Sequence, residues 1–249
     1  MKDYIGRTSL GAICVATLYT TLIAVSFAQV NTNLDQQASA WIINMTQAGG
    51  QNKATSAAIE NVTLKSGQVV IEPMMSGPKN SNVLFYKNLG VTDANWFKRE
   101  LDIYIPSDAY ANVQATELDL FAYNSPWRFQ FGTQCVKDAD WNGWDDLLNQ
   151  WVDLSGMKCN LTANAWHHLE FWYHRDPRTS TACSGNPCAY FDELGVDYQY
   201  TAINLKTPCS PIPAGWGNQY GVDTQLDLNN NGGLNYEYIR HDTVTALGR

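Results

Sequence analysis

Residues 114–135, QATELDLFAYNSPWRFQFGTQC, show a clear alternation of apolar and polar side chains. Successive side chains of a β-strand point to opposite faces, so Leu118 and Leu120 share one face and Glu117 and Asp119 share the other. The alternation resumes after a Tyr-Asn-Ser-Pro turn. The segment therefore predicts an antiparallel hairpin with one apolar face and one polar face.

Short alternating or β-rich runs recur along the chain, separated by clusters of Pro, Gly, Asn and Ser. No long segment shows a helical period, although residues 145–154 could form one short helical turn. Many short strands with few helices favour a single all-β domain built as a sandwich or barrel. Further strands are predicted at residues 62–71, 83–86, 96–105, 165–174, 190–205, 222–228 and 235–247.

The first 28 residues have the pattern of an export signal. Basic residues precede a mostly apolar run, and Ser26-Phe27-Ala28 fits a small-x-small cleavage site. We therefore predict a signal peptide at residues 1–28 and a secreted or periplasmic protein with no membrane span in the mature chain. Residues 29–40 are polar and expected to be loose. Residues 29–60 are expected to form an N-terminal polar segment with the first strand or strands, and residues 61–249 the β-sandwich domain.

The composition is acidic, with 24 Asp and Glu against 16 Lys and Arg and a net charge of −8. Such a chain repels nucleic acid and polyanionic sugars unless a local basic patch overrides the net charge, and the sequence contains no such patch. The charge therefore favours a neutral ligand and no nucleic-acid partner.

Five cysteines lie outside the export signal, and an oxidising compartment favours disulfides. Cys135 ends a predicted strand and Cys159 precedes the next, so we predict a bridge between them, worth ~3 kcal/mol by loop closure. Cys183, Cys188 and Cys209 offer one more bridge and one odd thiol. Cys188–Cys209 would close a hairpin and Cys183–Cys188 a tight loop, and the sequence does not choose between them.

Two short motifs resemble a known superfamily. Asn164-Ala-Trp-His-His-Leu resembles the x-W-H-H-[VL] strand of laminin-G-like jelly rolls, and Glu117-Leu-Asp119 resembles part of the catalytic strand of related glucanases. Together they resemble the concanavalin A-like lectin/glucanase superfamily, which implies a two-sheet antiparallel jelly-roll β-sandwich. Residues 131–135, 166–168 and 225–227 also resemble an exported bacterial group without a firmly assigned activity.

The polar face of the hairpin is a candidate active site. Glu117 and Asp119 lie two strand positions apart, ~6.6 Å at the backbone. Their mutual repulsion raises the pKa of one carboxyl group. Glycoside hydrolysis needs two carboxyl groups across the scissile bond, about 5–5.5 Å apart in retaining enzymes and about 6.5–9.5 Å in inverting enzymes. An ordinary solvated strand face is the alternative.

The chain departs from the glucanase pattern at the next acidic position. Where those strands carry a second glutamate, this chain has Phe121 and Ala122. A hydrolase would therefore need an acid from another strand, for which the candidates are Glu170, Asp227 and Glu100.

Tryptophans supply a second indication of a sugar ligand. Trp141, Trp144 and Trp151 crowd one polar region, and flat aromatic rings stack on the C–H faces of sugars. Core packing explains single aromatic residues equally well. Three indoles in one polar region favour a ligand platform.

Residues 138–143, DADWNG, match the start of a D-x-[DN]-x-[DN]-G calcium loop, and residues 227–232 match it again. Neither match has a glutamate at the twelfth position. A polar loop of Asx turns is the favoured alternative. No cofactor is required, and calcium is a candidate ligand of Asp138, Asp140, Asn142 and Asp146.

These patterns predict an exported protein that binds a neutral polysaccharide or oligosaccharide in a sheet groove. The alternative is a glycoside hydrolase with Glu117 as nucleophile, Asp119 modulating it and Glu170 as acid/base. A surface module that recognises protein is a third hypothesis. The candidate ligand-binding residues are Arg128, Gln130, Trp141, Trp144, His168, Trp172, Gln225 and Asp227.

Overall fold

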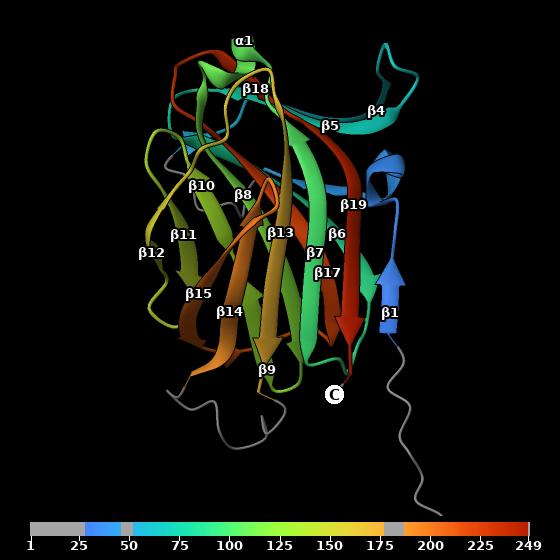
Figure 1. Cartoon of the computed structure of the whole chain (residues 1–249), viewed down its shortest axis with the longest axis vertical. Coiled ribbons are helices and arrows are strands. Elements are labelled where there is room, and N and C mark those ends of the chain that lie inside the picture. The colour runs from blue at the N-terminus through green and yellow to red at the C-terminus, as the bar shows by residue number, and fades with distance from the viewer. Residues whose placement is uncertain (1–27, 46–51, 177–186, 249) are drawn as a thin grey trace, which may run out of the picture.

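A computed structural model describes residues 28–45, 52–176 and 187–248 of the chain (Figure 1). These residues form two antiparallel sheets that pack face to face. The predicted all-β, two-sheet jelly-roll β-sandwich is therefore confirmed. The predicted signal peptide lies outside the described residues except for Ala28, which begins β1.

The first layer is called here the β13 sheet. Its central strands follow the order β15-β14-β13-β7-β19-β5-β18, with β1 paired to β19 and β4 paired to β5. Its strands are β1 (Ala28–Asn31), β4 (Ser56–Thr63), β5 (Val69–Gly77), β7 (Trp96–Tyr104), β13 (Trp166–Arg175), β14 (Pro187–Val196), β15 (Gln199–Pro208), β18 (Gly233–Tyr236) and β19 (Tyr238–Leu247).

The second layer is called here the β8 sheet. Its order is β12-β11-β10-β8-β17-β6-β2, with β9 paired to β8, β16 to β9 and β3 to β6. Its strands are β2 (Ile42–Asn44), β3 (Asn52–Lys53), β6 (Ser81–Gly90), β8 (Val113–Asn124), β9 (Trp127–Phe131), β10 (Thr133–Val136), β11 (Asp140–Asp145), β12 (Gln150–Lys158), β16 (Ser210–Pro211) and β17 (Gln219–Leu228).

The core lies between the two layers and follows the alternation of the strands. Leu118 and Leu120 of β8 are fully buried and belong to one apolar cluster with Phe97 of β7 and Phe171 of β13. The predicted hairpin is present as β8 and β9, with Asn124 paired to Trp127 beside its turn. Because one set of alternate side chains fills the core, the other set on β8 must face outward.

A buried ion pair connects the two layers. Arg99 of β7 and Asp242 of β19 are both fully buried, with Arg99 Nη2 3.1 Å from Asp242 Oδ2. Arg99 Nη1 also donates to the main-chain oxygens of Asp119, at 2.9 Å, and Asp223, at 2.6 Å. The guanidinium therefore fixes the backbones of β8 and β17 from the core side.

Three strand predictions each cover parts of two strands. Residues 62–71 contain the end of β4, a turn with Gly67 at φ 84° and the start of β5. Residues 190–205 contain two strands divided at Asp197 and Tyr198, both of which have positive φ. Residues 235–247 contain the end of β18 and all of β19.

The helical turn predicted at residues 145–154 is absent. This segment contains the end of β11, a turn and the start of β12, and Asp145 accepts hydrogen bonds from the amides of Leu147 and Leu148 in the turn.

Residues 29–40, which were predicted to be loose, are held in place. β1 pairs with β19, and short 3-10 turns at Leu34–Gln36 and Ala38–Ala40 follow it. Leu34 and Trp41 are buried, and the Trp41 indole donates to the Leu34 carbonyl. Two large apolar side chains thus hold a segment whose average composition is polar. One α-helical turn, α1, occupies Ser107–Tyr110.

Two disulfides staple the sandwich. Cys135–Cys159 is present as predicted, with Cα atoms 5.3 Å apart. Cys188–Cys209 is the second bridge, with Cα atoms 5.9 Å apart, which resolves the alternative left open by the sequence. Cys183 lies outside the described residues. Among the described residues, no helix is long and apolar enough to cross a membrane.

Candidate functional site

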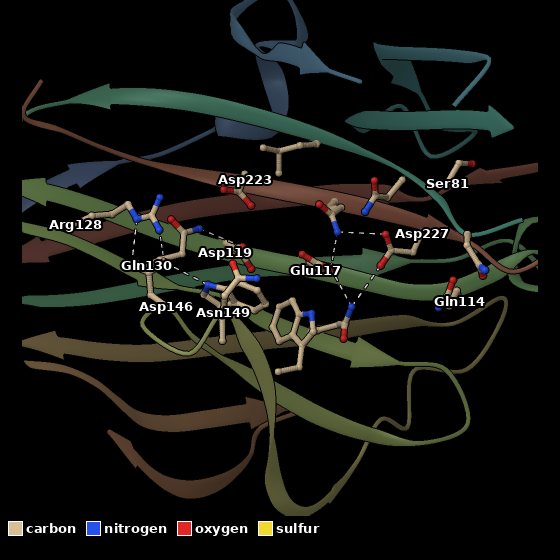
Figure 2. A pocket seen from close by; sticks show the side chains of 17 residues that line it. Ser81, Gln114, Glu117, Asp119, Arg128, Gln130, Asp146, Asn149, Asp223 and Asp227 are labelled. Atoms are coloured by element: carbon tan, nitrogen blue, oxygen red, sulfur yellow. Dashed lines mark hydrogen bonds and ion pairs between the residues drawn. The ribbon is translucent and has the colours of Figure 1, made fainter. Parts of the chain in front are cut away.

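A cavity of about 690 Å³ lies over the outward face of the β8 sheet (Figure 2). Arg128 and Asp146 lie toward one end and Ser81 and Gln114 toward the other, with the acids of β8 and β17 between them. We call it the groove. Its lining residues are Asn80, Ser81, Asn82, Leu84, Gln114, Glu117, Asp119, Arg128, Gln130, Gln134, Trp144, Asp146, Asn149, Trp151, Asp223, Gln225 and Asp227.

Strand register explains why the acids meet on the floor of the groove. Asp119 of β8 lies directly opposite Asp223 of β17, and Glu117 lies opposite Gln225. Asp227 is two positions further along β17, on the same face. Two neighbouring strands therefore bring four carboxyl groups to one surface, where directly opposed like charges are destabilising.

Glu117 and Asp227 form one pair of acids. Gln134 Nε2 donates to Glu117 Oε1 at 2.9 Å and lies 3.4 Å from Asp227 Oδ2, while Gln225 donates to both carboxyl groups. Burial, and next the negative charge of Asp227, raise the pKa of Glu117 well above its usual value. Burial raises the pKa of Asp227 to about 7. Near neutral pH this pair therefore retains a proton.

Asp119 and Asp223 form the second pair. Asp119 Oδ1 accepts a hydrogen bond from the Thr133 amide at 2.9 Å, and Gln130 Nε2 donates to Oδ2 at 3.4 Å. Burial raises the pKa of Asp119 to about 6. Burial, and next the charge of Asp119, raise the pKa of Asp223 well above its usual value. Both pairs can therefore donate as well as accept hydrogen bonds.

Arg128, the basic residue of the groove lining, lies toward one end of the groove. Arg128 Nε donates to Asp146 Oδ2 at 3.1 Å, and the Ser210 hydroxyl contacts the same carboxylate. Trp144 Nε1 lies 3.4 Å from Asp146 Oδ1. Trp144 also packs edge to face against Trp151, with ring centroids 5.1 Å apart. This end therefore combines indole surface with an arginine whose charge is already balanced.

The lining is acidic overall, with five carboxyl groups against one guanidinium. A cavity lined by one sign of charge concentrates its field and repels ligands of the same sign. The charge of the lining therefore opposes the approach of anionic ligands.

The structure brings most of the predicted ligand-binding residues together. In the groove are Glu117, Asp119, Arg128, Gln130, Trp144, Gln225 and Asp227.

Trp141 was predicted as a stacking surface, and this prediction is wrong. Its side chain is 0% exposed and meets Phe171 edge to face in the core, with centroids 6.0 Å apart. Trp141 and Trp144 are three positions apart on β11, so they point to opposite faces of the sheet. The segment forms a strand instead of the expected loop, and the strand buries one of the indoles.

Glu170, His168 and Trp172 are not in the groove. They lie on β13, in the other layer, on the face that alternates with the buried Leu169 and Phe171. Glu170 therefore cannot act across the groove from Glu117, which corrects the predicted acid/base. Alternation predicts the face that a side chain occupies within its sheet, but not the sheet to which the strand belongs.

The four predicted calcium ligands do not converge. Asp138 precedes β11, Asp140 begins it, and Asp146 follows its end, so the strand separates these carboxyl groups. Asp140 pairs with Lys158 at 2.6 Å, and Asp146 pairs with Arg128. Asn142 is a strand residue that pairs with Gln134 of β10. The calcium motif in the sequence corresponds to a β-hairpin strand.

Sequence reasoning named Trp151 as part of the indole platform, and Trp151 does line the groove. It missed several other lining residues, among them Asp223 and Gln134. Asp223 had a usable signal, because residues 223, 225 and 227 alternate with Val222, Thr224 and Leu226 on the opposite face of β17. Gln134 had none, because its place depends on which strands lie next to one another.

No protein-family profile matches the chain, and a search of curated proteins finds no match. Solved structures similar to it include carbohydrate-binding modules of the β-sandwich superfamily, at 11% identity and TM-score 0.44, over 85% of this chain and 60% of that one. An alginate lyase from a Chlorella virus matches at 10% identity and TM-score 0.48, over 87% and 98% of the two chains.

Arcelin-5, a lectin-like defence protein from Phaseolus vulgaris, matches at 7% identity and TM-score 0.45, over 88% of this chain and 98% of that one. The chain spans about three fifths of the first of these structures.

Proposed function

We propose that the groove binds a neutral polysaccharide or oligosaccharide. The observation that supports this most directly is the lining of the groove, which combines amides, proton-retaining carboxyl pairs and two indoles in one elongated cavity. Sugar hydroxyls both donate and accept hydrogen bonds, and a carboxyl pair that holds one proton offers both functions. Trp144 and Trp151 supply apolar surface for the C–H faces of a sugar ring.

The charge of the groove sets the class of sugar. Arg128 is balanced by Asp146, so no free cation in the lining is available to neutralise a uronate or a sulfate. An anionic glycan would approach five carboxyl groups. A neutral glycan needs only hydrogen bonds and stacking, which the lining provides.

Hydrolysis of the bound glycan is the second candidate function, and one observation favours it. Asp227 of β17 supplies the acid from another strand that Glu170 cannot supply, and its pKa is about 7, suited to a general acid near neutral pH. The two acid pairs lie two strand positions apart along β8, ~6.6 Å at the backbone, and the separation of their carboxyl groups would decide between retaining and inverting hydrolysis.

Export remains part of the proposal. Two disulfides in the described residues are compatible with an oxidising, extracellular compartment. The signal peptide itself stays a prediction from residues 1–28. Detection of a mature N-terminus at Gln29 in secreted protein would test it.

The decisive experiment is a panel of soluble neutral and anionic oligosaccharides, scored by calorimetry for binding and by reducing-end assay for cleavage. Trp144→Ala is expected to weaken binding about tenfold, because one stacked ring contributes on the order of 1–2 kcal/mol. Glu117→Gln is expected to retain binding and to abolish any cleavage.

Trp172→Ala is the matched control, since Trp172 is a half-buried indole on the opposite outer face of the sandwich. Equal losses of binding from Trp144→Ala and Trp172→Ala would contradict a groove site. Tighter binding of the anionic panel than of the neutral panel would contradict the proposed sugar class.

A further inference from the structure

A compact group of charged side chains lies on the outer face of the β13 sheet, on the side of the sandwich away from the groove. Glu100 of β7 is directly opposite Glu170 of β13, and Asp102 is opposite His168. One ligand atom each from Glu100, His168 and Glu170 lie within 4.8 Å of one another. Like charges directly opposite one another in a sheet need a compensating cation.

A hydrogen bond with Asp102 fixes the orientation of the His168 imidazole. Its Nδ1 lies 2.8 Å from Asp102 Oδ1, and Asp102 also accepts a hydrogen bond from Arg240 Nε at 2.9 Å. A carboxylate held in this way accepts a hydrogen bond from Nδ1–H, which leaves the lone pair on Nε2. Tyr198 stacks on the imidazole, with ring centroids 4.5 Å apart, and restricts its rotation.

The free nitrogen of His168 faces the two glutamates. Nε2 is buried and makes no hydrogen bond within the described structure. It lies 3.4 Å from Glu170 Oε1 and 3.8 Å from Glu100 Oε1. A lone pair that faces two carboxylate oxygens in a buried position is unfavourable unless a cation lies between them.

The spacing matches a tetrahedral metal ion. Ligand atoms about 2.0–2.2 Å from zinc are roughly 3.3–3.5 Å apart at tetrahedral angles. The two distances from His168 Nε2 are near this value, so a small contraction of Glu100 would complete the coordination. The histidine and two glutamates, with Asp102 hydrogen-bonded to the histidine, are the kinds of ligand and second-sphere group that zinc sites use.

Lys98 accounts for only part of the negative charge. Its Nζ lies 2.7 Å from Glu100 Oε2 and 2.6 Å from Glu170 Oε2. It therefore holds the two outer carboxylate oxygens and leaves both Oε1 atoms directed toward the imidazole. The Tyr200 hydroxyl donates to Glu170 Oε1, and a carboxylate oxygen has a second lone pair for a metal.

We propose that Glu100, His168 and Glu170 bind a zinc ion on this outer face, with Asp102 as the positioning residue for His168. Imidazole and carboxylate together suit zinc and similar first-row divalent ions, whereas calcium prefers oxygen ligands alone. The ion would join β7 to β13 and leave a fourth coordination position for water. The inference is independent of the function of the groove.

The test is calorimetric titration of tag-free protein, first treated with EDTA, with zinc chloride and separately with calcium chloride. We expect one zinc ion per chain and at least tenfold weaker binding of calcium. His168→Gln and Glu170→Gln are each expected to weaken zinc binding at least tenfold. Asp102→Asn should weaken it about 10- to 100-fold, because it frees the imidazole.

His174→Gln is the matched control, because His174 lies on the same face of β13 and has a single carboxylate partner, Asp192, at 2.8 Å. It should leave the zinc affinity unchanged. A melting curve of each variant, recorded without metal, establishes that the variant is folded. If His168→Gln does not fold, Glu100→Gln, at a more exposed position, replaces it in the test. The anomalous signal of a zinc-soaked crystal would locate the ion beside His168.

Absence of stoichiometric zinc binding would overturn the proposal. Equal affinity of the wild-type protein and His168→Gln, or an anomalous peak at His174 or His241 instead, would also overturn it. Saccharide binding should be unchanged after EDTA treatment if zinc binds as proposed, because the two sites lie on opposite faces of the sandwich.

Discussion

The two outer faces of the sandwich carry similar side chains and use them in opposite ways. In the groove of the β8 sheet, acids lie beside acids, and burial raises the pKa of Asp119 to about 6 and of Asp227 to about 7. On the β13 sheet, acids lie beside cations and histidines. There burial is outweighed by hydrogen bonds from His168 and Arg240, which hold the pKa of Asp102 below its usual value.

This contrast between the two faces gives them opposite effects on how the stability of the fold depends on pH. A carboxyl group whose pKa is raised on folding stabilises the fold at low pH, and that contribution is lost as the pH rises through the folded pKa. A carboxyl group whose pKa is lowered contributes stability above its unfolded pKa, which is lost on acidification. The groove therefore weakens the fold at neutral and alkaline pH, whereas the outer face of the β13 sheet supports it there.

The largest expected effect comes from the arginine behind the groove. Arg99→Met leaves Asp242 as a fully buried, unpaired carboxylate and removes the positive charge behind the groove acids. We expect a loss of about 3–5 kcal/mol in the free energy of unfolding, measured by urea denaturation. The double variant Arg99→Met/Asp242→Leu should recover a large part of it. A loss below about 1 kcal/mol for the single variant would show that the pair does not hold the layers together.

A medium effect of opposite sign is expected in the groove. Asp227→Asn imitates the protonated acid and removes the cost of ionising a buried carboxyl group whose pKa is about 7. The variant should be more stable than wild type by roughly 2 kcal/mol at pH 8, about 4–8 °C in melting temperature, and nearly unchanged at pH 4. Asp153→Asn, at an exposed position of β12, is the control and should change neither value. A loss of stability at pH 8 would contradict the contrast between the two faces.

The smallest effect is expected on the β13 sheet. Lys98→Met removes the ammonium group that joins Glu100 to Glu170. Since Lys98 is partly exposed, the loss should be about 1 kcal/mol in EDTA. It should be larger at pH 8 than at about pH 2, because burial is outweighed by hydrogen bonds from Lys98 and Tyr200, which lower the pKa of Glu170, and its carboxylate is lost only on strong acidification. Thermal melting at the two pH values measures it. If Lys98→Met raised the free energy of unfolding at pH 8, the acids of the β13 sheet would affect stability as those of the groove do, and the contrast would be contradicted.

Much of the fold could be predicted from the sequence because period-two alternation is a local property. It assigned Leu118 to the core and Glu117 to the outer face, and it located the β8–β9 hairpin. It could not reveal that β17 lies next to β8, since that pairing joins residues about a hundred positions apart. Burial is the largest cause of the raised pKa values of Asp223 and Asp227, and it likewise depends on which strands pack together.

The same limit explains the two main errors about the site. Trp141 and Trp144 look equivalent in a polar stretch, and only the register of β11 decides that one is core and the other lines the groove. Glu170 has the chemistry of an acid/base and the right face of its own strand. It lies in the other layer because strand order follows the packing of the whole sandwich, which no single segment specifies.

The contacts of Arg99 with Asp119 and Asp223 go to the carbonyl oxygens of these residues, not to their side chains. Those oxygens are present whatever residue occupies either position. The floor can therefore exchange its acids for other polar or aromatic groups while the scaffold beneath it stays in place. This separation makes the protein a suitable starting point for laboratory evolution of new ligand preferences.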